Sequence, residues 1–113
     1  MELNVGGSKV YAYTGTRPVD PAKPAVVFVH GAANDHSVWL LQSRYFAHHG
    51  KGVLAIDLPG HGRSAGPVLG SVDAIADWLP RALDAAGLAQ AALVGHSLGA
   101  LAALACAARH PAR

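Results

Sequence analysis

Cysteine, charged residues and long apolar runs are all scarce in this sequence of 113 residues. The single cysteine, Cys106, excludes an internal disulfide and fits a reducing compartment, where it would pack as a small apolar residue. The apolar runs are far shorter than a membrane span, and the N-terminus has no basic segment followed by an apolar one. These absences predict a cytoplasmic protein that has neither a membrane segment nor a secretory signal.

Charge and metal-ligand patterns are sparse as well. The net charge is +2, and the sequence has no cluster of lysine and arginine that would favour nucleic acid as a partner. It contains no His-Glu-x-x-His, no cysteine pair and no carboxylate–histidine spacing typical of a metal site. We therefore expect neither a metal nor another cofactor.

Apolar residues make up 51% of the chain, which suits the core of one small domain, assigned here to residues 1–113. Residues 2–14 alternate loosely around a Gly-Gly-Ser segment and predict a β-hairpin. Three apolar runs then predict buried strands, each followed in turn by a helical pattern. The expected strands are 25–29, 53–56 and 91–94, and the expected helices are about 37–49, 71–86 and 98–109. This order predicts an α/β, three-layer sandwich with a mostly parallel sheet.

Several side chains carry more specific expectations. Pro80 lies inside the second helix and should kink it or restart it. The last helix is apolar nearly all round, so we expect it to be covered on several sides. Three histidines of the first helix region are expected to be solvated, namely His36, His48 and His49.

The segment Gly95-His96-Ser97-Leu98-Gly99 joins the third predicted strand to the last helix. It fits the G-x-S-x-G pattern of a nucleophile elbow, a sharp turn that presents a serine at the edge of a sheet. Gly95 and Gly99 lack a Cβ, which would let strand and helix pass close to each other. Taken alone, the five residues also fit a glycine-rich turn with Ser97 as a helix N-cap.

A loop after the first buried strand, His30-Gly31-Ala32, could complete such a site. An acyl-transfer site needs two backbone N–H groups to hold an oxyanion. We expect one from Leu98, which follows the serine, and the other from Ala32. An ordinary strand-to-helix loop is the alternative explanation of this tripeptide.

The second apolar strand is followed by the loop Asp57-Leu58-Pro59-Gly60-His61-Gly62-Arg63-Ser64. With Ala65 and Gly66 it could suggest a dinucleotide site. The third glycine arrives one residue late, however, and the next helix begins only near residue 71, whereas a phosphate cradle needs the glycines to open the helix. We therefore set this alternative aside.

Together, His30-Gly31 with Ser37 and Trp39, the loop 57–64 and the segment 95–99 resemble the α/β-hydrolase superfamily. The resemblance covers essentially the whole chain. It implies Ser97 as nucleophile, Ala32 and Leu98 as oxyanion-hole donors, and His30 and Gly31 as supports of the loop. It also implies a small-molecule substrate, an ester, amide or related carbonyl cleaved through an acyl-enzyme. The superfamily's epoxide hydrolases and haloalkane dehalogenases carry an aspartate in place of the serine.

One feature departs from that family. Its acid and histidine follow the nucleophile, whereas here only one helix follows, and His110 at its far end would lie roughly 20 Å from Ser97 by helix rise. His96 adjoins the serine, but successive side chains diverge at such a turn. We therefore interpret the chain as the N-terminal half of a hydrolase, inactive alone, with an exposed apolar edge at residues 91–94. The alternative is an inactive fragment or a non-catalytic binding member of the fold, and the oligomeric state is not predicted.

Overall fold

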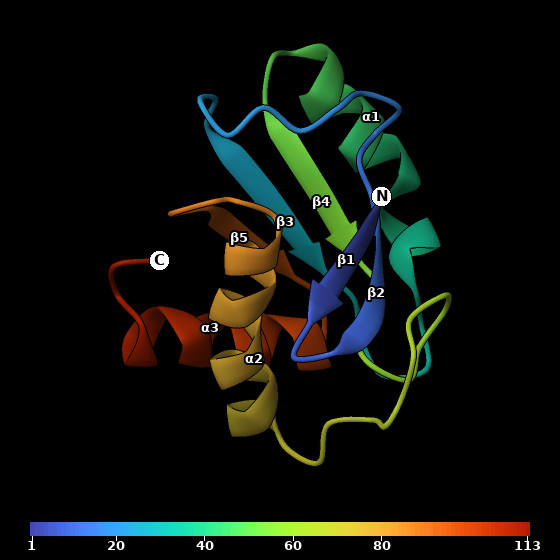
Figure 1. The fold of residues 1–113 in the computed structure, drawn as a ribbon, viewed down its shortest axis with the longest axis vertical. Helices are drawn as coiled ribbons and strands as arrows, with labels where there is room; N and C mark the ends of the chain where they lie inside the picture. The colour runs from blue at the N-terminus through green and yellow to red at the C-terminus, as the bar shows by residue number, and fades with distance from the viewer.

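The computed structural model describes residues 1–113, which form one mixed sheet flanked by helices. The elements in chain order are β1 (Glu2–Val5), β2 (Ser8–Tyr13), β3 (Ala25–Val29), the 3-10 helix η1 (His36–Trp39), α1 (Leu40–His48), β4 (Gly52–Ile56), α2 (Val72–Ala85), β5 (Ala92–Gly95) and α3 (Leu98–Arg109). The strand order is β1-β2-β4-β3-β5, as Figure 1 shows. Strands β4, β3 and β5 are parallel, while the β1–β2 hairpin joins them antiparallel through β2. The predicted α/β fold with a mostly parallel core is confirmed.

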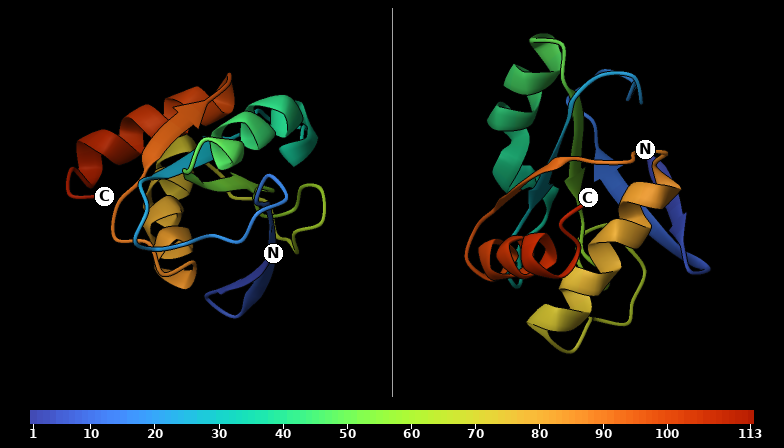
Figure 2. Two further views of the ribbon diagram at one scale, coloured as in Figure 1. Left: turned by 90° about the horizontal axis from the view of Figure 1, so that it is seen from above. Right: turned by 90° about the vertical axis from the view of Figure 1, so that its left-hand side faces the viewer.

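Strands β3 and β4 are buried along their whole length because helices cover both faces of the sheet. Val27 pairs with Leu54 and Phe28 with Ala55, so alternate positions of the two strands face opposite layers. The face of Val27 packs with α2 and α3, and the face of Phe28 packs with the α1 region. Figure 2 shows α1 and α2 on opposite sides of the sheet, which gives the expected three layers.

The helix boundaries follow the capping residues closely. The carboxylate of Asp35 accepts a hydrogen bond from the N–H of Ser37, and η1 begins there, so the predicted helix 37–49 is split into a 3-10 turn and α1. Ser71 caps α2 by accepting from the N–H of Ala74 at 3.0 Å. Pro80 is buried within α2 without ending it. Of the two expected effects of Pro80, a kink or a restart, the continuous helix rules out the restart.

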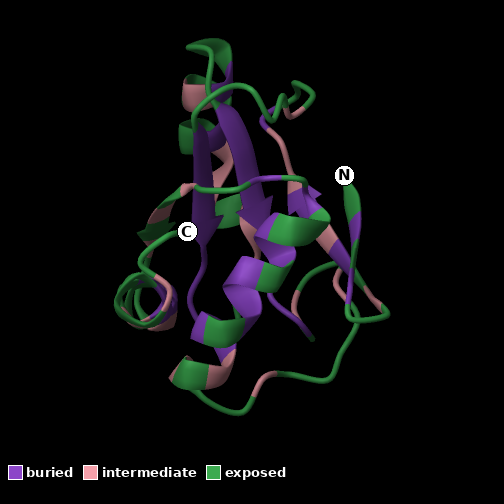
Figure 3. Cartoon of the chain, turned by 60° about the vertical axis from the view of Figure 1, so that its left-hand side comes forward, coloured by how far each residue is buried: buried purple, intermediate pink, exposed green.

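The end of the chain differs from expectation. β5 is the edge strand, as predicted, but its residues are exposed or half-exposed rather than buried, because β3 is the only strand beside it. The expectation that α3 is covered on several sides is wrong, since Leu101 is 57% exposed and Leu104 72%. Figure 3 shows α3, beside the C-terminus, largely in the colour of exposed residues. None of the helices combines the length and apolar character that a membrane crossing requires.

Candidate active site

Ser97 occupies a strained turn between β5 and α3. Its φ of 57° and ψ of −119° lie outside the regions that L-residues favour, and α3 begins with the next residue. The side chain makes no capping hydrogen bond and is exposed. The turn therefore holds a free hydroxyl at the carboxyl edge of the parallel strands, which is the edge where α/β sheets bind ligands.

The two flanking glycines explain why the turn can close. A Cβ on Gly95 would overlap the carbonyl of Gly99, and a Cβ on Gly99 would overlap the carbonyl oxygen of Val29. Both obstacles are backbone atoms, so no change of side-chain rotamer could relieve them. Strand β5, helix α3 and the end of β3 thus meet at contacts that only glycine allows.

The loop after β3 lies against the serine turn. A Cβ on Gly31 would stand 3.3 Å from Cβ of Ser97, and Gly31 itself is buried. The chain turns at once, with the N–H of Asn34 donating to the Gly31 carbonyl at 3.2 Å and Ala33 at a φ of 62°. Ala32 is exposed, and its N–H has no hydrogen-bond partner within the chain.

The N–H of Leu98 is also free of an intrahelical partner, because Leu98 is the first residue of α3. The positive end of the helix dipole lies at the same point and favours negative charge there. The structure thus brings two unpaired amide donors, Ala32 and Leu98, to the edge of the sheet that carries Ser97.

His30 connects the Gly31 loop to the loop after β4. The ring is fully buried, Nδ1 donates to the Gly31 carbonyl at 2.6 Å, and Nε2 accepts from the N–H of Leu58 at 3.0 Å. Burial lowers the pKa of His30, so the ring is neutral and carries its proton on Nδ1. Both nitrogens are engaged, so His30 links the two loops and is not free to accept a proton.

Asp57 is an anchor that the sequence analysis did not single out. Its carboxylate is fully buried and accepts from the backbone N–H of His36 at 2.7 Å, from Nδ1 of His36 at 2.9 Å, and from the N–H of Arg63 at 2.9 Å. The prediction that His36 is a solvated helix residue is wrong, because its side chain is only 16% exposed and is bound to Asp57. A separation of 21 positions along the chain leaves no local sequence signal for this contact.

Asp35 lies near this pair, so that one ligand atom from each of Asp35, His36 and Asp57 falls within 4.8 Å of the others. The atoms already have protein partners, however. Asp35 accepts from both the N–H and the hydroxyl of Ser37, and Nδ1 of His36 donates to Asp57. The three residues therefore form a hydrogen-bonded anchor that ties the η1 region to the loop after β4.

Three other histidines lie in turns, in loops or at the end of α3. His110 is at the opposite end of α3, where Nε2 lies 2.8 Å from Oδ1 of Asp77. His61 sits in the loop after β4 beside the ring of His30, with ring centroids 5.1 Å apart. His96 is exposed next to Ser97. None of them forms a hydrogen bond with Oγ of Ser97.

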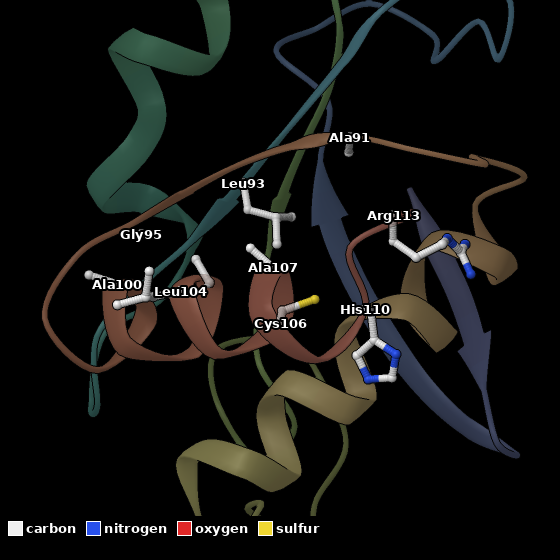
Figure 4. Close-up of a pocket in the computed structure, with 10 residues that line it drawn as sticks. Ala91, Leu93, Gly95, Ala100, Leu104, Cys106, Ala107, His110 and Arg113 are labelled. Carbon is white, nitrogen blue, oxygen red and sulfur yellow. The ribbon is translucent and has the colours of Figure 1, made fainter.

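A shallow apolar groove runs beside the turn, between β5 and α3. It has a volume of about 360 Å³, and its lining includes Leu93, Leu104, Cys106 and His110. Figure 4 shows Leu93 on the strand above the turns of α3, and Leu104 on that helix. Cys106 is buried at this interface, as its expected role as a small apolar residue requires, and burial raises the pKa of its thiol. Ser97 is not part of the groove.

Comparison with known proteins identifies the family. The model of the alpha/beta hydrolase fold family matches residues 24–113, and the chain belongs to this family. It is 37% identical over 89 residues to the dihydrolipoyllysine-residue acetyltransferase component of the acetoin cleaving system of Pseudomonas putida, an alignment that covers 78% of this chain and 24% of that protein.

It is likewise 37% identical over 79 residues to 2-succinyl-6-hydroxy-2,4-cyclohexadiene-1-carboxylate synthase of Escherichia coli O8 (strain IAI1), covering 70% of this chain and 31% of the synthase. Among solved structures, epoxide hydrolase A of Mycobacterium thermoresistibile superposes with a TM-score of 0.83 at 26% identity, covering all of this chain and 35% of the hydrolase. The chain thus spans about a quarter to a third of the length of these relatives.

Proposed function

We propose that Ser97 is the nucleophile of a hydrolase that acts on an ester, amide or related carbonyl compound. The observation that carries the proposal is the backbone of Ser97, whose positive φ is held by the glycines on either side and whose hydroxyl is exposed. Strain of this kind persists only where the surrounding structure maintains it, and it concentrates at functional sites. A serine used only as a helix cap would bond to the helix, which Ser97 does not.

In this mechanism Oγ of Ser97 attacks the carbonyl carbon, and a base takes the hydroxyl proton. Negative charge then develops on the carbonyl oxygen, and the N–H groups of Ala32 and Leu98 donate to it. Collapse of the tetrahedral species expels the leaving group, which takes up that proton, and leaves an acyl-serine. Water cleaves the acyl-serine in the second half of the reaction. Hydrolysis and acyl transfer share the first half, so the proposal concerns that half.

His30 and Gly31 position the oxyanion donor in this scheme. The Gly31 carbonyl accepts from His30 and from Asn34, which fixes the plane of the peptide that joins Gly31 to Ala32. Because that peptide is planar and trans, the N–H of Ala32 points away from the anchored carbonyl. A donor that is oriented in advance costs no reorganisation when charge develops.

The base and its acidic partner are proposed to come from the part of the protein that the relatives have and this chain does not span. No histidine of the 113 residues bonds to Oγ of Ser97, and His30 is already engaged at both nitrogens. The same observation favours a second candidate, a member of the fold that binds a substrate-like molecule without cleaving it. Labelling of Ser97 distinguishes the two.

The test uses a fluorophosphonate probe, which labels activated serines. The gene product at its natural length and the 113 residues by themselves are treated in parallel, and the labelled peptide is identified by mass spectrometry. We expect stoichiometric labelling of Ser97 in the natural product and none in Ser97→Ala. The 113 residues alone should react at least about 100-fold more slowly, because a general base contributes about that much or more.

Ser37→Ala is the matched control, since Ser37 is also exposed and should not affect labelling. A natural product that stays unlabelled, or one in which Ser97→Ala is labelled as well as the wild type, would overturn the proposal and support the binding candidate. Rapid labelling of the 113 residues alone would contradict the placement of the base outside this chain.

A further inference from the structure

A second hollow lies at the opposite edge of the sheet from Ser97. It has a volume of about 440 Å³ and is formed by the turn after β2 and the outer face of α1. The parallel strands end at the Ser97 edge, whereas this hollow adjoins the C-terminal end of α1, just before β4 begins. In Figure 1 α1 is in the upper part of the molecule and α3 in the lower part. We call this hollow, with Thr16, Arg17, Arg44, Tyr45, His48 and His49 in its lining, the basic pocket.

The basic pocket gathers positive charge without any acidic residue in its lining. Neither Arg17 nor Arg44 has a carboxylate within ion-pair distance, unlike Arg109 and Arg113 at the other end of the molecule. Arg17 donates from Nη2 to Nδ1 of His48 at 3.0 Å, and Arg44 donates from Nε to the hydroxyl of Tyr13 at 2.9 Å. A guanidinium has five N–H donors, so most of those on both arginines remain free.

The backbone that carries Arg17 is strained. Thr16 has a φ of 71°, which a β-branched residue rarely adopts. The preceding Gly15 is buried against α1, and a Cβ there would lie 2.5 Å from the carbonyl oxygen of Ser43. This contact pins the turn to α1 and places Arg17 against His48. The strain is thus located where the turn brings Arg17 against α1.

Hydrogen-bond donors and aromatic rings line the same pocket. Arginine can only donate, so Nδ1 of His48 accepts, and the neutral ring carries its hydrogen on Nε2 as a further donor. The rings of Tyr45 and His49 also line the pocket and stack, with centroids 4.2 Å apart and planes inclined by 24°. Two guanidinium groups and an imidazole thus lie beside an aromatic surface.

We propose that the basic pocket binds the phosphate group of a small soluble phosphate monoester. Planar guanidinium groups bind phosphate oxygens in pairs, and two arginines match a dianion better than a singly charged carboxylate. The stacked rings offer a surface for the organic part of the ligand. The pocket lies away from Ser97, so this binding is independent of the proposed hydrolase chemistry.

The experiment titrates the protein with methyl phosphate at constant ionic strength and follows the histidine Cε1–H signals by NMR. We expect saturable shifts of two of the seven histidines, those of His48 and His49, with weaker shifts for the monoanion methyl sulfate. Arg17→Gln and Arg44→Gln should each raise the apparent Kd about tenfold, the loss expected for a charge-assisted hydrogen bond. Lys23→Gln, an equal change of charge on an exposed loop, should leave the Kd within about twofold.

Three outcomes would overturn the proposal. The first is an effect of methyl phosphate no larger than that of methyl sulfate, and the second is binding by the arginine variants as tight as that of the wild type. In the third, the protein sediments with vesicles that contain phosphatidic acid but shows no response to methyl phosphate. That result would assign the pocket to a lipid headgroup. Labelling of Ser97 is unaffected in all three, so failure here is separable from failure of the proposed function.

Discussion

Helices α2 and α3 pack on the same face of the sheet, yet they bury very different amounts of apolar surface. Half of the residues of α2 are buried, including Trp78, Leu79 and Leu83. α3 buries only small residues, Gly99, Ala102, Ala103 and Cys106, and leaves Leu101 and Leu104 exposed. The strand that leads into α3 is equally uncovered on its outer edge.

The difference separates what holds the fold together from what shapes the site. Of the two helices, α2 supplies more of the apolar burial, and apolar burial is the main favourable contribution to folding. The serine turn joins β5 to α3, which are the less buried elements. Close contacts of its glycines with backbone atoms define the shape of the turn. A site shaped by local sterics can form where burial is low, while its uncovered edge invites pairing with other chains.

The largest expected effect tests the steric part of this comparison. Gly99→Ala would place a methyl group on the carbonyl oxygen of Val29, which cannot move without breaking the sheet. We expect the free energy of unfolding to fall by about 3 kcal/mol or more. Urea titration followed by tryptophan fluorescence measures it. Gly70→Ala is the matched control, because an added Cβ meets nothing within 4 Å there; equal stability of the two variants would contradict the steric account.

Local chemistry explains how far the fold was predictable from the sequence. Continuous apolar runs identified β3 and β4 because both faces of these strands are buried, and the helix predicted over about 71–86 is α2, which Ser71 caps. The burial of β5 and α3 was predicted wrongly, since burial depends on neighbours that a local pattern does not describe. The continuity of α2 through Pro80 likewise depends on tertiary packing.

The candidate site divides in the same way. The close approach of Gly95 and Gly99 follows from a five-residue pattern and is present in the structure. The contact between His36 and Asp57 joins η1 to the loop after β4, so no local sequence pattern near either residue predicts it. The role of Ser97 stays a prediction, because no side chain of the 113 residues forms a hydrogen bond with its hydroxyl.

A pair of leucine substitutions compares the two helices directly. Leu83 on α2 is 1% exposed and Leu104 on α3 is 72% exposed. Leu83→Ala should lower the free energy of unfolding by about 3 kcal/mol, through lost burial and the cavity left behind, whereas Leu104→Ala should change it by less than about 0.5 kcal/mol. Urea titrations of both variants under the same conditions provide the measurement. A cost for Leu104→Ala close to that of Leu83→Ala would show that the outer face of α3 is covered in solution.

The smallest expected effect concerns the polar joint between the two helices. Asp77 of α2 accepts from Nε of Arg109 at 2.9 Å and from Nη2 at 2.7 Å, and lies 2.8 Å from Nε2 of His110. These partners lower the pKa of Asp77 from its ordinary value of 3.8 to about 2. The folded state therefore holds the carboxylate ionised where the unfolded chain would protonate it.

The stabilisation from this joint should be complete above about pH 4 and should disappear as the pH falls through about 2. Because the carboxylate is half-exposed, the effect is small. Thermal unfolding of the wild type and Asp77→Asn between pH 5 and 2 should show a Tm difference that shrinks toward the acid end. Asp20→Asn removes the same charge from a loop outside the joint and should show no such convergence. A Tm difference that stays constant with pH would mean that Asp77 joins α2 to α3 by packing or by neutral hydrogen bonds rather than by its charge.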